Sequence, residues 1–228
     1  MIQFFFNLSP NPMKVLLALE EMGVPFEPHA VDTRKGDQFS PAYLALNPNG
    51  KVPAIVDGDV TVFDSNAILL YLTETTGRFG PAAGSRGRAE FLSWLMFVAT
   101  GVGPFSGQAV HFKHFAPEKV PYAHTRYQFE ADRHYGILDA RLADRRFLLG
   151  EEYGVVDMAA WGWARMVPFI LGDDAWTRFP NLKRSFDETS ARPAAHRAEA
   201  FRQAHAAAFK AEMDEGARAV MFRHLKAA

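Results

Sequence analysis

Three short segments near the start of the chain carry residues whose types and order suit the binding of a small peptide. Ser9-Pro10-Asn11-Pro12 forms a turn after a β-prone run, Val52-Pro53 opens a second such run, and Asp64-Ser65 stands where a strand gives way to a helix. Hydroxyl, amide, carboxylate and exposed backbone groups at such positions can bind a ligand. Each segment taken alone also fits ordinary turn and helix-capping chemistry.

The Val52-Pro53 pair has two interpretations. A trans proline at the start of an edge strand is the ordinary one. A cis bond would instead turn the backbone N–H and C=O of Val52 outward, where they would pair with the main chain of another peptide.

Asp64 and Ser65 place opposite recognition chemistries side by side. Ser65 can cap the following helix, and the exposed N–H groups there attract a carboxylate. Asp64 can accept from an ammonium group. The pair therefore matches the zwitterionic end of an amino acid, although a plain helix cap fits the same residues.

The turn at Ser9 and Asn11 suits a sulfur anion. Its hydroxyl and amide can donate hydrogen bonds to a thiolate at the positive end of the next helix, although Asn11 can also simply cap that helix. The chain contains no cysteine, which excludes disulfides, thiolate metal sites and a protein thiol nucleophile. Any sulfur chemistry must therefore use a sulfur that a ligand brings.

An α/β unit is expected to position these segments. The order β-α-β-α-β-β-α closes near residue 78 and follows from turn and stop signals at Gly23, Ser40-Pro41, Asp57-Gly58-Asp59 and Gly77. The expected strands are residues 2–6, 26–31, 52–56 and 60–63, and the expected helices are residues 13–22, a short helix from Pro41, and 66–76.

The rest of the chain is expected to be helical. Residues 79–87 are rich in glycine, proline and small residues and are predicted to form a linker. Beyond it, apolar residues recur at helical spacing in residues 91–99, 127–142 and 155–170. We therefore predict an α/β domain over 1–78, a linker over 79–87 and an all-helical domain over 88–228 that forms the pocket for a second substrate.

Composition narrows the classes of function. The 228 residues are 48% hydrophobic and 22% charged, which suits a folded protein with a real core. A net charge of −1 gives no basic field for nucleic acid or anionic membranes, and no apolar run reaches the roughly 20 residues of a spanning helix. The N-terminus lacks the features of a secretory signal, so a cytoplasmic location is expected.

Histidines, aromatic residues and the tail have plainer interpretations. The spacing of His111, His114, His124 and His134 does not match a metal site, so no metal is predicted. Most aromatic side chains are expected in the core, with one or two of them as pocket walls; the candidates are Trp94, Phe97, Phe105, Phe112, Trp161 and Trp163. In the tail, Phe209, Met213, Ala217, Met221 and Leu225 fit one helical face, which would pack on the helical domain, cover the thiol or contact another subunit.

Taken in order, the three segments closely resemble the glutathione S-transferase superfamily over essentially the whole chain. The resemblance implies a thioredoxin-like domain followed by a helical domain. It implies that Val52, before a cis Pro53, pairs with the cysteinyl backbone of glutathione, and that Asp64 and Ser65 hold its γ-glutamyl end. It also places Lys51 near the glycyl carboxylate.

GEEYGVVDMAAW resembles the buried N-capping motif of the family, with Asp157 at the third helical position. Gly154 stands where the family usually has Ser or Thr, so half of the capping box is missing.

Finer motifs resemble the bacterial nu-class-like, disulfide-reducing branch. These are NLSPNP, RKGDQF, GQAVHFKHFAP and RYQFE. The resemblance implies that Ser9 and Asn11 contact the glutathione sulfur, that Gln38 binds glutathione, and that Arg126 reaches across from a neighbouring subunit. The chain has Ser9 where that branch usually has Thr, and Asp64 where Glu is commoner.

The expected protein is therefore a homodimeric glutathione transferase with glutathione-dependent disulfide reductase activity, in which the glutathione thiolate is the nucleophile. Its second substrate would be a disulfide or a small apolar electrophile. Two alternatives remain. One keeps the thiolate for conjugation, β-ether cleavage or dehalogenation of an aromatic metabolite, and the other is a glutathione-fold binding or scaffold protein without turnover.

Overall fold

The computed structural model describes residues 1–226. Its contacts divide the chain into two compact units, one made of residues 1–71 together with the segment that starts at Pro193, the other of residues 72–192. The predicted boundaries at residues 78 and 87 divide the chain by position along the sequence, whereas these units are defined by contacts, so the boundaries stay a prediction.

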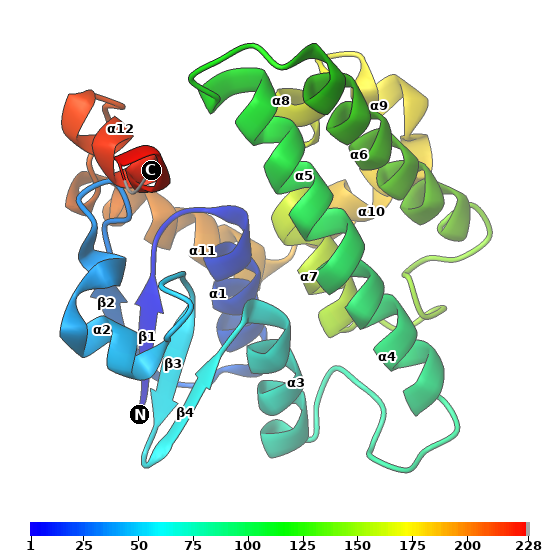
Figure 1. The fold of residues 1–228 in the computed structure, drawn as a ribbon. Coiled ribbons are helices and arrows are strands. Elements are labelled where there is room, and N and C mark those ends of the chain that lie inside the picture. The colour runs from blue at the N-terminus through cyan, green and yellow to red at the C-terminus, as the bar shows by residue number, and fades with distance from the viewer. Residues whose placement is uncertain (227–228) are drawn as a thin grey trace. The chain divides into compact units, whose positions relative to one another are not determined.

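The first unit is built on a four-stranded mixed sheet (Figure 1). Its strand order is β2-β1-β3-β4, with β1 parallel to β2 and antiparallel to β3, and β3 antiparallel to β4. The elements are β1 (Ile2–Phe6), α1 (Pro10–Met22), β2 (Phe26–Ala30), the 3₁₀ turn η1 (Asp37–Phe39), α2 (Pro41–Leu46), β3 (Ala54–Asp57), β4 (Val60–Phe63), the start of α3 (Ser65–Thr76), α11 (Pro193–Ala204), the 3₁₀ turn η4 (Ala206–Ala208), α12 (Glu215–Met221) and the 3₁₀ turn η5 (Arg223–Lys226). The predicted α/β order is confirmed.

Strand β1 shows how the sheet is covered on both faces. Successive side chains of a strand point to opposite faces. Phe4 and Phe6 are fully buried, and the ring of Phe6 packs against Phe201 of α11 at 5.1 Å between centroids. Phe5 points the other way, toward Tyr43 of α2 at 6.0 Å. The aromatic run IQFFF therefore holds one helical layer on each side of the sheet.

Local turn chemistry explains where these elements end. Gly23 adopts a left-handed conformation (φ 65°) after α1, and Gly58 does the same (φ 61°) in the β3–β4 hairpin. Ser40 caps α2 by accepting a hydrogen bond from the Tyr43 N–H at 3.3 Å. These three sequence predictions are confirmed.

Two sequence expectations for this unit are wrong. Asn11 does not cap α1, because the helix begins at Pro10 and Ser9 is the N-cap residue. The tail is not one helix with a continuous apolar face. Phe209 is in extended backbone and α12 begins only at Glu215, after Asp214 caps it.

The second unit consists of helices, as predicted. They are the remainder of α3, α4 (Arg88–Phe97), the π-helical η2 (Val98–Val102), α5 (Gly103–Val110), the π-helical η3 (His111–Phe115), α6 (Pro121–Arg141), α7 (Val155–Ala164), α8 (Val167–Leu171), α9 (Ala175–Arg178) and α10 (Pro180–Ser190). Every residue of α7 is buried, so this helix is the centre of the unit. Residues 77–87 contain neither helix nor strand.

A buried carboxylate fixes the start of α7. Asp157 accepts hydrogen bonds from the Gly154 N–H at 3.0 Å and from the Leu148 N–H at 2.8 Å. The first of these is the half of the capping box that the sequence retains. Asp157 therefore joins the loop before α7 to the helix itself.

Within the described part of the chain, no helix combines the length and the apolar composition that crossing a membrane requires.

Candidate functional site

The turn between β1 and α1 presents Ser9 at a helix N-terminus. Ser9 has the extended backbone of an N-cap residue (φ −78°, ψ 166°), yet among the described residues its side chain makes no capping hydrogen bond. The turn is held by Asn7, whose Oδ1 accepts from the Ser9 N–H at 2.9 Å and whose Nδ2 donates to Thr33 Oγ1 at 3.1 Å. The Ser9 hydroxyl is therefore available to a ligand at the positive end of α1.

A cavity of about 400 Å³ lies beside Ser9. All of its lining belongs to the first unit and comes from three segments, the turn at 7–9, the segment at 32–34 after β2, and the tail at 206–211. Its volume is within the range of small-molecule pockets. This is the place in the first unit where a predicted site residue meets an open cavity.

Asp64 caps α3, which corrects the expectation that Ser65 does so. Its Oδ1 accepts from the Asn66 N–H at 2.8 Å and the Ala67 N–H at 3.2 Å. Asp64 holds a left-handed backbone (φ 69°), which is rare and costly outside glycine. Ser65 becomes the first helical residue and is buried. The cap thus uses one oxygen of an exposed carboxylate, and Oδ2 accepts no hydrogen bond within residues 1–226.

A buried lysine lies beneath this cap. Lys14 of α1 is only 1% exposed, and its Nζ donates to Asn66 Oδ1 at 2.9 Å. Burial lowers the pKa of Lys14 from 10.5 to about 7, although the nearby Asp64 carboxylate acts in the opposite direction. Lys14, Asn66 and Asp64 therefore form one connected polar group. Lys14 and Asn66, which the hydrogen bond joins, are 52 residues apart in sequence.

The Val52-Pro53 bond is cis. The segment before it is fixed through the Lys51 carbonyl, which accepts from the Tyr43 hydroxyl at 2.7 Å and from Asn47 Nδ2 at 2.6 Å. The Lys51 side chain itself is exposed, and Val52 packs against buried neighbours in the core beneath α2. The backbone around Val52 is thus held by side chains of α2 and its C-terminal end.

Gln38 is buried and incompletely paired. It is 6% exposed, its Nε2 donates to the Thr33 carbonyl at 3.2 Å, and its Oε1 accepts no hydrogen bond from any described residue. Phe39 next to it packs so closely on Gly50 that a β-carbon there would lie 3.0 Å from the ring. The loop of Gln38 is thereby pressed against the segment that leads to Lys51. A buried carboxamide with an idle acceptor suits a ligand that donates a hydrogen bond.

Arg126 lies in the second unit, on α6. Its side chain is 49% exposed and pairs with Glu130 at 2.8 Å. Hydrogen bonds from Arg133, with further help from Arg126 and His134, lower the pKa of Glu130 despite its desolvation. The other eight predicted site residues all belong to the first unit.

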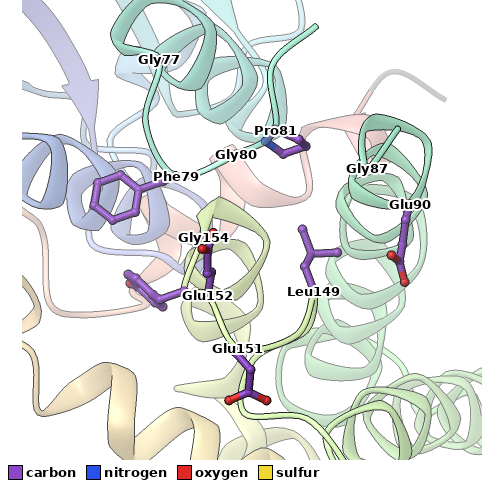
Figure 2. A pocket seen from close by; sticks show the side chains of 11 residues that line it. Gly77, Phe79, Gly80, Pro81, Gly87, Glu90, Leu149, Glu151, Glu152 and Gly154 are labelled. Carbon is purple, nitrogen blue, oxygen red and sulfur yellow. The ribbon is translucent and has the colours of Figure 1, made fainter. Parts of the chain in front are cut away.

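A larger cavity of about 520 Å³ occurs in the second unit, where the linker passes the N-terminal end of α7 (Figure 2). Three carboxylates line it, those of Glu90, Glu151 and Glu152, and the first is paired with Arg141. None of the predicted site residues contributes to it.

Of the six candidate aromatic pocket walls, Trp161 and Trp163 are buried core residues and the other four are partly buried. Phe97 and Phe105 enclose the buried His134 at 5.3 and 5.0 Å between ring centroids, and Trp161 borders a cavity of only about 10 Å³. His111, His114 and His134 each contact an aromatic ring. Among residues 1–226 there is no group of three or more His, Cys, Asp or Glu placed to hold a metal ion.

Sequence reasoning missed Lys14, Asn66, Asp32 and Arg34, which build the surroundings of the site. One of them left a signal. Lys14 occurs within the apolar run PMKVLLALEEM and shares a helix face with Leu17 and Ala18. A charge on an otherwise apolar face predicts a buried, partnered side chain.

Family models and relatives match this chain over most of its length. The model described as "Glutathione S-transferase, N-terminal domain" matches residues 8–75, and "Glutathione S-transferase, C-terminal domain" matches residues 116–193. The disulfide-bond oxidoreductase YfcG of Escherichia coli is 40% identical over 208 residues, which cover 85% of this chain and 92% of the relative.

Solved structures of glutathione transferases are also similar to this chain. A glutathione transferase of Phanerochaete chrysosporium, URE2P6, in complex with oxidized glutathione, superimposes with a TM-score of 0.85 at 33% identity, over 89% of this chain and 96% of the other. A glutathione transferase of Burkholderia graminis with two glutathione molecules bound per subunit superimposes with a TM-score of 0.80 at 36% identity, over 86% of each chain.

Proposed function

The chain belongs to the glutathione S-transferase family, and we propose that it is a glutathione-dependent enzyme whose nucleophile is the thiolate of bound glutathione and whose main reaction is the reduction of disulfides. The proposal follows from the chemistry of the site in the first unit. The disulfide-bond oxidoreductase among its relatives supports the choice of reaction.

The observation that carries the proposal is the state of Ser9. Its hydroxyl is at the N-terminal end of α1, borders a cavity of about 400 Å³ and is not used for capping within the described chain. Hydrogen bonds to a sulfur anion and the positive helix end both favour the thiolate, and so lower the pKa of a thiol from its ordinary value of about 8.5. Asn11, at the second position of the helix, would donate the other hydrogen bond.

The reaction consists of two thiol–disulfide exchanges. In the first, the glutathione thiolate attacks one sulfur of the substrate disulfide, a new S–S bond forms, and the other sulfur leaves as a thiolate that takes up a proton. In the second, the thiolate of another glutathione attacks the glutathione sulfur of the mixed disulfide. The S–S bond of the mixed disulfide breaks, the remaining substrate sulfur leaves as a thiolate that takes up a proton, and oxidised glutathione is formed. The protein has no cysteine, so both thiolates must come from glutathione. The related structure with two glutathione molecules per subunit is consistent with this stoichiometry.

The rest of the tripeptide would be bound by the segments around the sheet. The Oδ2 of Asp64 would accept from the γ-glutamyl ammonium group, and the start of α3 at Ser65 would bind its carboxylate. The backbone of Val52, before Pro53, would pair with the cysteinyl residue. Lys51 would neutralise the glycyl carboxylate, and the idle Oε1 of Gln38 would accept one hydrogen bond from the ligand.

The second unit would supply the apolar neighbourhood and the dimer contact. Large side chains are exposed on α6, Tyr122 at 81% and Phe129 at 60%, one on each side of the exposed Arg126. Such residues suit an interface between two copies. We expect a homodimer in which Arg126 reaches the glutathione of its neighbour, with domains at 1–78 and 88–228 joined by 79–87. A cytoplasmic location, where thiols are kept reduced, suits the reaction.

Two assays on matched variants test the proposal. Ser9→Ala and Asn11→Ala are compared with the parent and with Ser93→Ala, whose hydroxyl is exposed on α4 and donates to the Ala89 carbonyl. We expect glutathione-dependent reduction of hydroxyethyl disulfide by the parent, a loss of about ten- to a hundredfold in each site variant, and no change in the control.

The same proteins are assayed with an aryl halide. If the parent conjugates glutathione to the aryl halide and does not reduce the disulfide, the proposed reaction is wrong. The protein would then be a transferase of the detoxification type. An inactive parent that still binds glutathione would indicate a binding or scaffold protein.

A further inference from the structure

The tail of the chain packs on the loop that follows β2 (Figure 1). Val220 of α12 lies 3.5 Å from the position of a β-carbon on Gly36, and the guanidinium of Arg223 lies 3.4 Å from the ring centre of Phe39. The tail and the loop that bears Gln38 therefore form one packed layer of the first unit.

Three hydrogen bonds clamp the tail between η4 and α12. Arg34 Nη1 donates to the carbonyl oxygens of Lys210 at 2.7 Å and Ala211 at 2.6 Å, and Asp32 Oδ2 accepts from the Lys210 N–H at 2.7 Å. All three reach backbone atoms of the tail. They fix the path of the chain whatever side chains residues 210 and 211 carry.

The Asp32 carboxylate of the clamp stays ionised although it is buried. Asp32 is 4% exposed, and burial alone would raise its pKa. The N–H groups of Lys210 and Arg34 and the ammonium of Lys35 outweigh burial and lower the pKa. A carboxylate that stays ionised accepts stronger hydrogen bonds than a neutral group. Asp32 and Arg34 thus hold the tail with one full charge of each sign.

An aromatic contact anchors the same segment. The ring of Phe209 packs edge-on against Phe6 at 5.6 Å between centroids. Phe6 is the last residue of β1 and directly precedes the turn of Ser9. The tail is thereby fixed on the strand that also positions the predicted thiol-binding residue.

The clamped segment, residues 206–211, is a wall of the cavity beside Ser9. Asn7, Leu8 and Ser9 form one side, the clamp residues form another, and the tail closes a third with Ala206, Phe209, Lys210 and Ala211. The cavity is open to solvent on its remaining side, so a group attached to a sulfur at Ser9 would have to displace the tail and break the clamp where it extends toward residues 206–211.

We propose that Arg34 and Asp32, by clamping residues 206–211, limit the size of the group that the sulfur beside Ser9 can carry or attack. This inference rests on the proposed function, because it places the glutathione sulfur at Ser9. On the side of residues 206–211, the wall favours disulfides of low molecular weight over bulkier ones.

The test uses binding, which needs no turnover. The parent, Arg34→Met and Arg218→Met are titrated calorimetrically with S-methylglutathione and with S-triphenylmethylglutathione. Arg218 is an exposed cation of α12, so its replacement makes the same charge change without touching the clamp. We expect the bulky ligand to bind the parent at least tenfold more weakly than the methyl ligand. In Arg34→Met, the ratio of the two affinities should fall at least fivefold, while the affinity for S-methylglutathione stays within about twofold of the parent. Arg218→Met should keep the parent's ratio.

Amide hydrogen exchange of the parent protein gives a second measurement, which does not depend on whether a variant folds. The Lys210 amide should be protected with S-methylglutathione bound and exchange at least tenfold faster with the triphenylmethyl ligand. An unchanged penalty in Arg34→Met, or a tail that stays protected with the bulky ligand bound, would overturn the inference and leave the proposed function standing. A parent that binds neither ligand would instead remove the proposed function and the inference with it.

Discussion

The carbonyl oxygen of Phe79 lies 2.8 Å from the point where a β-carbon on Gly154 would be. The same oxygen accepts a hydrogen bond from the Val155 N–H at 2.9 Å. The linker therefore satisfies one of the free N–H groups of α7 with its backbone and occupies the space of the missing N-cap side chain. This explains why a residue without a β-carbon suits position 154.

Gly154→Ser should therefore destabilise the protein, although serine is a good N-cap residue in general. We expect a loss of about 1–3 kcal/mol in the free energy of unfolding, because Phe79 must move and its hydrogen bond to Val155 weakens. Urea unfolding measures it.

Gly107→Ala is the matched control for this change. A β-carbon there would meet only the Trp163 ring at an ordinary 3.7 Å, and Gly107 is inside α5. Alanine should stabilise the helix by about 0.5–1 kcal/mol. A Gly154→Ser variant at least as stable as the parent would show that the Phe79 carbonyl does not exclude a side chain.

The contrast between Ser40 and Arg34 shows what the sequence could predict. Ser40 caps α2 through a residue three positions away, and Gly23 and Gly58 act through their own backbone, so short-range rules located these ends and the order of elements. The clamp of Arg34 joins residues 176 and 177 positions apart. No local pattern encodes such a pairing.

The candidate site divides in the same way. Ser9 and Asp64 stand at strand-to-helix joints, which sequence signals mark, and the roles proposed for them come from the family resemblance. Which residue caps each helix depends on geometry that the sequence leaves open, so the caps are Ser9 and Asp64 and not Asn11 and Ser65. The expected continuous helix of the tail is wrong because Phe209 belongs to an extended segment, although its apolar spacing also fits a helix.

Lys14 should make stability depend on pH above neutrality. Its pKa is about 7 in the folded protein against 10.5 when exposed, so between these values the unfolded chain binds more protons than the folded one. The free energy of unfolding therefore rises with pH from about 7 toward 10.5, by an amount on the order of a few kcal/mol, and this gain is lost as the pH falls back to 7.

Lys14→Met should flatten that rise. Lys183→Met, which removes an exposed lysine paired with Asp187, should leave it unchanged. Urea unfolding at pH 6.5, 8 and 9.5 compares the three proteins. A parent whose stability is constant or falls across this range would show that Lys14 stays charged in the fold.

Asp64 combines two tasks that substitution can separate. Asn tolerates the left-handed backbone and caps a helix as well as Asp does, but it has no charge. Asp64→Asn should therefore keep the free energy of unfolding within about 0.5 kcal/mol and weaken glutathione binding about tenfold, because the ammonium group loses its partner. Asp64→Ala should also lose about 1–2 kcal/mol of stability.

Calorimetry with reduced glutathione and thermal unfolding measure the two effects. Asp187→Asn, an equal change of charge on an exposed residue of α10, is the control. Undiminished glutathione affinity in Asp64→Asn would assign Asp64 to capping alone.

Gln128 has the same hydrogen-bonding environment as Gln38 and serves as its matched control. In both Gln38 and Gln128 the Nε2 donates to a backbone carbonyl while the buried Oε1 accepts no hydrogen bond from residues 1–226. Methionine is close in shape and removes both polar atoms, so each substitution deletes one hydrogen bond and one unsatisfied acceptor. Their costs largely cancel, and stability should change by less than about 1 kcal/mol in either variant. Gln38→Met should nevertheless weaken glutathione binding about tenfold, because the ligand loses its acceptor, while Gln128→Met should bind as the parent does. Equal affinities in the two variants would mean that Gln38, like Gln128, serves only to hold its loop.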